Sequence, residues 1–196
     1  MKTHAAKFET IFEGKEIPTN PKNKGLIKWG RIFALNGLAP KYGTESSHGN
    51  LSFRTKNRMI ITRSGSDLEN LEENELVEVT SCDAEKFCVH AKGLFAPSSE
   101  SFEHFEIYQA RPEINAVFHG HSQEILLSAK KLGIVETENA VPYGTIENLR
   151  EVMNALGKND FIIMKGHGFI ALGKTIGECG KKALQFQKKA VEVKTK

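Results

Sequence analysis

The sequence has no long hydrophobic run, and its amino terminus carries no hydrophobic segment. No apolar stretch approaches the roughly 20 residues that a membrane-spanning helix needs. The first seven residues are mostly polar and basic, so they lack the apolar core of a secretory signal peptide. We therefore expect a cytoplasmic protein with no membrane partner.

Cysteine is scarce as well. The three cysteines are Cys82, Cys88 and Cys179, which form no C-x-x-C pair and are odd in number. Such a set does not indicate a disulfide framework and is typical of a reduced, intracellular protein. We interpret the three side chains as small buried apolar groups.

The basic residues gather at the two ends of the chain. Residues 1–31 carry seven Lys and Arg against three Glu, residues 181–196 carry six Lys against one Glu, and residues 67–78 hold six acidic residues and no basic one. A basic end can bind nucleic acid or a membrane surface. Aromatic residues do not interleave with these bases as a base-stacking platform requires. We therefore interpret the last lysines as a solvated helix face and expect no nucleic-acid partner.

The length of 196 residues suits one domain. Residues 1–24 are polar and contain two prolines, so we predict a loose or docking arm there, followed by a single domain over 25–196. Apolar residues at helical spacing predict helices over 26–36, 101–110, 123–131, 145–156 and 175–191. Short apolar or alternating runs predict strands over 49–54, 58–62, 76–80, 86–90, 114–118, 161–164 and 169–172. Short, closely spaced strands favour an antiparallel sheet.

Three histidines occupy positions where their side chains can be presented together. His119 and His121 follow the predicted strand over 114–118. Alternate residues of a strand point to the same side, so the two rings should project together, with Gly120 leaving room between them. His167 lies between two glycines, at the tip of a predicted hairpin.

Glu100 completes this set of candidate ligands. It follows two serines near the start of a predicted helix, a place that suits a carboxylate. Three imidazoles and one carboxylate are the ligand types of a divalent transition metal. The alternative is that the histidines are merely hydrogen-bonded and Glu100 is an ordinary first-turn acid; taken together, the residues favour a metal site. His104, one turn after Glu100, is predicted to be a supporting or structural histidine.

Three polar turns could bind an anion. Glycine lets backbone N–H groups approach an anion, while serine and asparagine add uncharged donors. Each turn alone is ordinary turn chemistry, but the three together could form a phosphate cradle. The residues are Gly49 with Asn50, Ser64 with Gly65, and Ser98 with Ser99.

Six motifs, in this order, resemble the class II aldolase/adducin family. They are GNLSFR at 49–54, ITRSG at 61–65, PSSE at 97–100, YQARP at 108–112, AVFHGHS at 116–122 and GHG at 166–168. The resemblance covers about residues 25–192. It implies an α/β fold, a three-layer α/β/α sandwich with a mostly antiparallel central sheet. It also implies a homotetramer with active sites at the subunit interfaces.

The resemblance further implies a role for each candidate residue. His119, His121 and His167 correspond to zinc ligands, and the six turn residues correspond to phosphate-binding positions. Glu100 corresponds to an acid that both approaches the metal and transfers a proton, for which it needs a raised pKa or a position away from the metal. The implied activity is a zinc-dependent aldolase that cleaves or forms a C–C bond in a small sugar phosphate through a metal-stabilised enediolate.

The sequence departs from the family pattern between His121 and His167, which only 45 residues separate. The loop that carries substrate-facing aromatic residues is therefore expected to be trimmed, with Tyr143 as its only tyrosine and no assigned role. We also expect the family's C-terminal tail, which could supply a catalytic tyrosine, to be missing.

Several related functions stay open. Glutamate rather than aspartate at Glu100 favours an aldolase over the family's sugar-phosphate 4-epimerases. A dehydratase of a thio-sugar phosphate or a decarboxylase could use the same metal. A non-catalytic interaction domain like the adducin head would not need the metal ligands, so their presence argues against it. The sequence names neither the sugar nor the metal, since zinc, manganese, iron and cobalt all accept these ligands.

Overall fold

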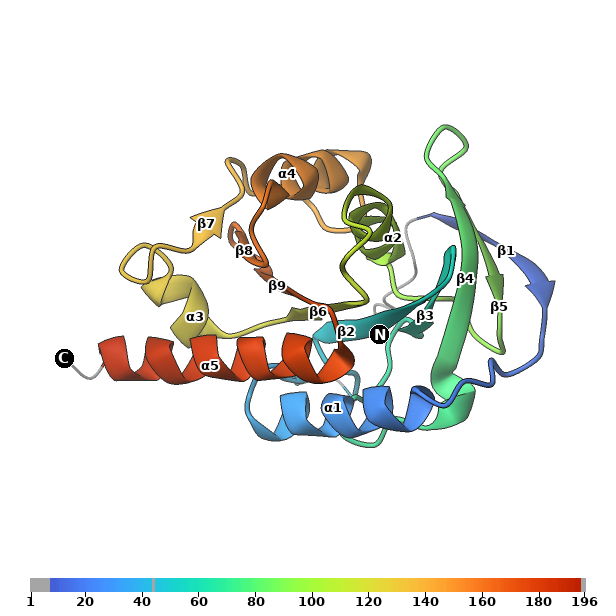
Figure 1. Cartoon of the computed structure of the whole chain (residues 1–196), viewed down its shortest axis with the longest axis horizontal. Coiled ribbons are helices and arrows are strands. Elements are labelled where there is room, and N and C mark those ends of the chain that lie inside the picture. Colours follow the sequence, from blue (N-terminus) through green and yellow to red (C-terminus); the bar gives the residue numbers. More distant parts are fainter. Residues whose placement is uncertain (1–7, 44, 195–196) are drawn as a thin grey trace.

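The computed structural model describes residues 8–43 and 45–194, which form one large mixed sheet with helices on both faces (Figure 1). The strands are β1 (Glu9–Gly14), β2 (Gly49–Thr55), β3 (Arg58–Thr62), β4 (Leu76–Asp83), β5 (Cys88–Lys92), β6 (Ala116–Gly120), β7 (Val135–Glu136), β8 (Phe161–Met164) and β9 (Gly168–Gly173). Over the described residues the strand order is β1-β5-β4-β3-β2-β6-β9-β8-β7. The β1–β5 and β7–β8 pairs are parallel and the other pairs are antiparallel.

Two layers of helices cover this sheet. On one face lie α1 (Asn23–Leu35), α3 (Gln123–Ser128) and α5 (Ile176–Lys194), and on the other lie α2 (Ser101–Ala110) and α4 (Ile146–Leu156) (Figure 1). Each layer forms its own apolar core with one face of the strands. The predicted α/β/α sandwich with a mostly antiparallel sheet is confirmed.

The strand sequences are apolar because both of their faces are buried. Successive residues of a strand point to opposite faces, so Phe118 packs in the core under α1 and α5 while Val117 packs in the core under α2 and α4. Ile60 and Ile61 divide in the same way between the two cores. A continuous apolar run is what a strand covered on both sides requires.

Two predicted helix starts are confirmed by their caps. The Ile125 N–H donates to Ser122 Oγ at 3.2 Å, and the Asn148 N–H donates to Thr145 Oγ1 at 3.2 Å. The predicted end of the helix after Ser122 is wrong, because α3 stops at Ser128 and not at Lys131. The chain leaves the helix through a turn at Gly133, which has a φ of +64°.

Two strands were not predicted. β1 pairs in parallel with β5, so residues 9–14 of the expected polar arm are docked on the sheet edge. The strand gives little hydrophobic signal because its two large apolar residues, Ile11 and Phe12, are adjacent and do not alternate with polar residues. They are 37% and 46% exposed. β7 has only two residues, too few to show a period.

Among the described residues we find no helix long and apolar enough to cross a membrane.

The contact between α1 and α5 depends on Gly180. A Cβ atom at this position would overlap the indole ring of Trp29. We predict that Gly180→Ala lowers the free energy of unfolding by about 1–3 kcal/mol through overpacking. Gly177→Ala on the same helix is the matched control, because its Cβ would meet only Thr175 Oγ1 at 4.0 Å. The control should leave stability unchanged or raise it by up to about 1 kcal/mol. Urea denaturation measures both, and equal stabilities for the two variants would contradict this packing.

Candidate functional site

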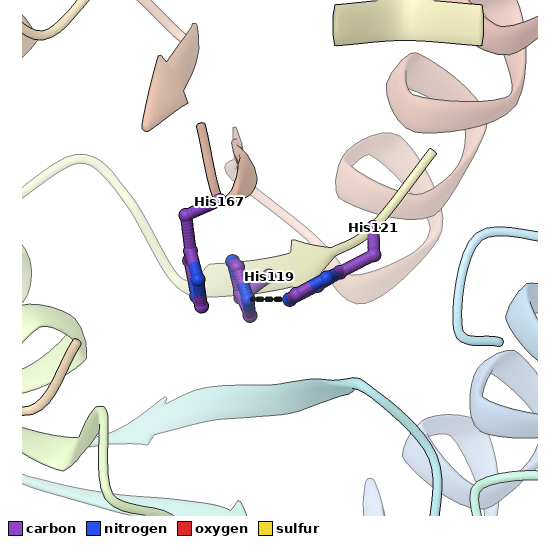
Figure 2. Close-up of side chains that lie close together, drawn as sticks. All are labelled: His119, His121 and His167. Carbon is purple, nitrogen blue, oxygen red and sulfur yellow. Dashed lines mark hydrogen bonds between the residues drawn. The ribbon is translucent and has the colours of Figure 1, made fainter. Parts of the chain in front are cut away.

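Three histidines meet where the end of β6 lies beside the β8–β9 hairpin. His119 is on β6, His121 follows that strand, and His167 is on the hairpin turn. The Nε2 atoms of His119 and His121 are 3.0 Å apart, and one ring nitrogen from each histidine lies within 4.8 Å of the others. Figure 2 shows the His121 ring directed at His119, with the His167 ring beside it. The expectation that His119 and His121 project together is correct.

Two glycines allow this close approach. A Cβ atom at Gly168 would lie 2.5 Å from the carbonyl oxygen of Gly120 and 2.7 Å from Cε1 of His119. A Cβ atom at Gly120 would lie 2.6 Å from the carbonyl oxygen of Leu38. Real Cβ atoms do not approach so closely, so the glycines of the two histidine motifs are required by space at the cluster.

The Glu100 carboxylate lies against His119 and His167. Its Oε1 is 3.1 Å from His167 Nε2, and its Oε2 is 3.3 Å from His119 Nε2. Asn50 Nδ2 donates a hydrogen bond to Oε2 at 2.6 Å. Glu100 stands at the N-cap position of α2 and is 5% exposed. The four residues predicted as metal ligands are therefore brought together.

The protonation states in this cluster suit a cation. Burial lowers the pKa of His119 to about 4, and burial with the charge of His119 lowers the pKa of His121 to about 2. Both imidazoles are then neutral near pH 7. The Nδ1–H of His119 donates to the Phe169 carbonyl at 2.9 Å, which leaves the lone pair of Nε2 facing the cluster.

Glu100 is ionised beside these neutral rings. Burial alone would raise the pKa of its carboxyl, but His119 and the hydrogen bonds from His167 and Asn50 outweigh burial and lower that pKa well below its usual range. For proton transfer we expected Glu100 to have either a raised pKa or a position away from the metal. The pKa of Glu100 is lowered and not raised. Neutral imidazole nitrogens and one carboxylate, directed at a common point, fit a divalent transition metal ion.

The three polar turns line the same pocket as the histidines and Glu100. The pocket wall includes Gly49, Asn50, Ser64, Gly65, Ser98 and Ser99. The last two turns are held side by side, because the Ser64 N–H donates to the Ala96 carbonyl and the Ser98 N–H donates to the Thr62 carbonyl, at 2.9 and 3.1 Å. Their predicted roles in binding a phosphate remain predictions, and the amide donor of Asn50 is engaged with Glu100.

Comparison with known proteins places this architecture in a family. Residues 24–191 match the family described as Class II Aldolase and Adducin N-terminal domain. The chain belongs to the class II aldolase/adducin family. The family membership predicted from the six motifs is thus confirmed.

Relatives of this chain in the class II aldolase/adducin family include both aldolases and a dehydratase. The L-fuculose phosphate aldolase of Methanococcus vannielii is 33% identical over 149 residues, which cover 67% of this chain and 76% of that protein. The methylthioribulose-1-phosphate dehydratase of Gluconacetobacter diazotrophicus is 34% identical over 126 residues, 64% of this chain and 55% of that protein. The crystal structure of l-fuculose-1-phosphate aldolase from Thermus thermophilus has a TM-score of 0.68 at 21% identity, covering 87% of this chain and 91% of that chain, and shows the same fold.

The pocket has further walls that the sequence did not identify. Ser46, Ser47, His48 and Arg63 line it as well. Tyr143 also lines it, and its ring stacks on that of His167 with centroids 5.5 Å apart. His48 directly precedes the first polar turn, which is the signal that could have identified it.

His104 lies outside the three-histidine cluster and is held inside the protein, which fits the expectation of a structural histidine. It is fully buried, and its Nδ1 lies 2.8 Å from Ser52 Oγ, which also lies 2.8 Å from the hydroxyl of Tyr108. Burial lowers the pKa of His104 to about 3, so the folded protein holds this ring neutral.

This buried histidine should make stability depend on pH. Below about pH 6.5 the unfolded chain binds a proton at His104 that the folded chain does not bind, so stability falls as the pH falls. We predict that, between about pH 5.5 and 4, the free energy of unfolding falls about 1.4 kcal/mol per pH unit more steeply for the wild type than for His104→Asn. Urea denaturation with a chelator present measures both slopes. Equal slopes would show that His104 is protonated in the folded state.

Proposed function

We propose that this family member is a zinc-dependent aldolase that cleaves or forms a C–C bond in a phosphorylated sugar. The observation that carries the proposal is that the three histidines and Glu100 share one pocket with the three polar turns. A metal-binding cluster alone, or an anion-binding set of turns alone, would fit many functions. Together they fit a substrate that bears both a phosphate and oxygens able to chelate a metal. The similarity to fuculose-phosphate aldolases supports this class of substrate.

The metal would be held by His119, His121, His167 and Glu100. A divalent cation there supplies Lewis-acid chemistry at the carbonyl and hydroxyl oxygens of a ketose phosphate. Zinc accepts imidazole nitrogens together with a carboxylate oxygen, and the resemblance names it, so we place it first among the divalent ions that accept this set.

The chain's own residues would bind the substrate and move the proton. The polar turns hold the phosphate, so that binding energy away from the reacting carbon orients that carbon. Glu100 takes or returns the proton on carbon. Because its contacts with the histidines and Asn50 lower its pKa, Glu100 has to give up one of them to gain basicity. Asn50 thus holds Glu100 in its resting position.

A dehydratase is the second candidate. The observation that favours it is the identity of 34% with a methylthioribulose-1-phosphate dehydratase. Removing a proton next to a carbonyl is common to both reactions, so the same metal ligands and Glu100 would serve either one.

We also propose the homotetramer with sites at subunit interfaces that the family resemblance implies. Light scattering of the purified chain tests it, and a monomer would contradict it.

Proton exchange in heavy water tests the aldolase proposal without knowledge of the aldehyde. The zinc-loaded protein is mixed with dihydroxyacetone phosphate, and the carbon-bound hydrogens of dihydroxyacetone phosphate are followed by NMR. The proposal predicts stereospecific loss of one hydrogen signal. No exchange by a folded, zinc-replete protein would contradict the proposal and place the dehydratase first.

Glu100 is tested in the same assay. We predict that Glu100→Gln retains zinc but slows the exchange by about 100-fold or more, because the amide cannot accept the proton. Glu106→Gln, on the same helix but outside the pocket wall, is the matched control and should exchange at the wild-type rate. If Glu100→Gln exchanged hydrogens at the wild-type rate, Glu100 would not be the residue that transfers the proton.

A further inference from the structure

His48 occupies the junction between the anion-type turns and the histidine cluster. It directly precedes Gly49, where β2 begins, and it is one of the residues that line the pocket. Its ring packs edge-on against His121, with centroids 5.4 Å apart, and against Tyr42, with centroids 4.9 Å apart. The backbone N–H of His48 donates to the Pro40 carbonyl at 2.8 Å, which fixes the chain at this point.

The segment that carries His48 is joined to the turn at Ser64 and Gly65. The Ser47 N–H donates to the Ser66 carbonyl at 2.9 Å. The Leu68 N–H in turn donates to Ser47 Oγ at 3.0 Å. These bonds hold residues 46–48 against the loop that follows the second polar turn. His48 therefore directly precedes the first polar turn, lies beside the loop that follows the second, and packs against His121.

The charges around the pocket single out His48. Among the described residues that line the pocket, Arg63 and His48 are the side chains outside the three-histidine cluster that can carry a positive charge. Arg63 already has partners: its Nε pairs with Glu75 Oε1 at 2.7 Å, its Nη1 donates to the Ser64 carbonyl at 2.9 Å, and its guanidinium lies 4.8 Å from the centre of the Phe95 ring. An imidazole offers at least one N–H donor in either protonation state, so His48 can serve a phosphate whether or not it is charged.

We propose that His48 is a further substrate-binding residue, whose imidazole N–H donates a hydrogen bond to the substrate phosphate where the polar turns meet the histidine cluster. The proposal rests on the proposed function, since it takes the pocket to be a phosphate site beside a metal. It extends the anion-binding set from neutral turns to one side chain that can be positively charged. His48 therefore contributes to affinity for the phosphate and leaves the metal ligands unchanged.

Inorganic phosphate is the probe that tests this role. Its binding to the zinc-loaded full-length chain is measured by calorimetry, together with zinc content. We predict that His48→Ala binds phosphate about tenfold more weakly, as expected for the loss of one strong hydrogen bond to an anion. His48→Gln retains a donor and should lose less. His90→Ala is the matched control, because His90 lies on β5 and pairs with Glu13 outside the pocket, and it should bind phosphate like the wild type.

Phosphate affinity of His48→Ala equal to that of the wild type would overturn the proposal. Loss of zinc by both His48 variants would also overturn it, because His48 would then act on the histidine cluster. Absence of phosphate binding by the wild type would overturn it as well. The measurement involves no turnover, so a His48-dependent phosphate site would still be seen in a protein that fails to exchange the hydrogens of dihydroxyacetone phosphate.

Discussion

The antiparallel pairing of β2, β6 and β9 holds the candidate site together. Asn50 on β2 stands opposite His119 on β6, and β9, which pairs with the other edge of β6, supplies the Phe169 carbonyl that accepts from His119 and leads back to the hairpin turn with His167. Burial removes these polar groups from water, a cost that only hydrogen bonds or a bound cation can offset. The bonds from Asn50 to Glu100 and from His119 to the Phe169 carbonyl offset part of it.

The charge of the cluster makes binding of a phosphate depend on binding of a metal ion. With the imidazoles of His119 and His121 neutral and Glu100 ionised, the protein groups contribute a negative charge at the edge of a pocket that we propose for a phosphate. A phosphate beside that carboxylate would be repelled. A divalent cation would reverse the sign of the local charge and attract the phosphate. The uncharged turns can therefore suffice for most of the cradle, because the cation supplies the attraction.

Local patterns predicted the parts of this structure that depend on neighbours in sequence. The spacing of His119 and His121, the hairpin tip at His167 and the cap at Ser122 all follow from local geometry. The bond between Asn50 and Glu100 spans 50 positions, and nothing near either residue signals it. The same holds for β1, whose partner β5 lies far along the chain and whose two large apolar residues are only partly covered. Long-range pairing of polar groups leaves no period in the sequence, so it became visible only in the structure.

Zinc K-edge X-ray absorption of the zinc-loaded protein shows which side chains bind the metal. We predict one zinc per chain with three imidazole nitrogens at about 2.0–2.1 Å and carboxylate oxygen at about 2.0–2.2 Å. The imidazole scattering should decrease by one ring in His167→Ala. A protein that binds no zinc, or a zinc shell without imidazole, would contradict the metal centre and with it the proposed chemistry.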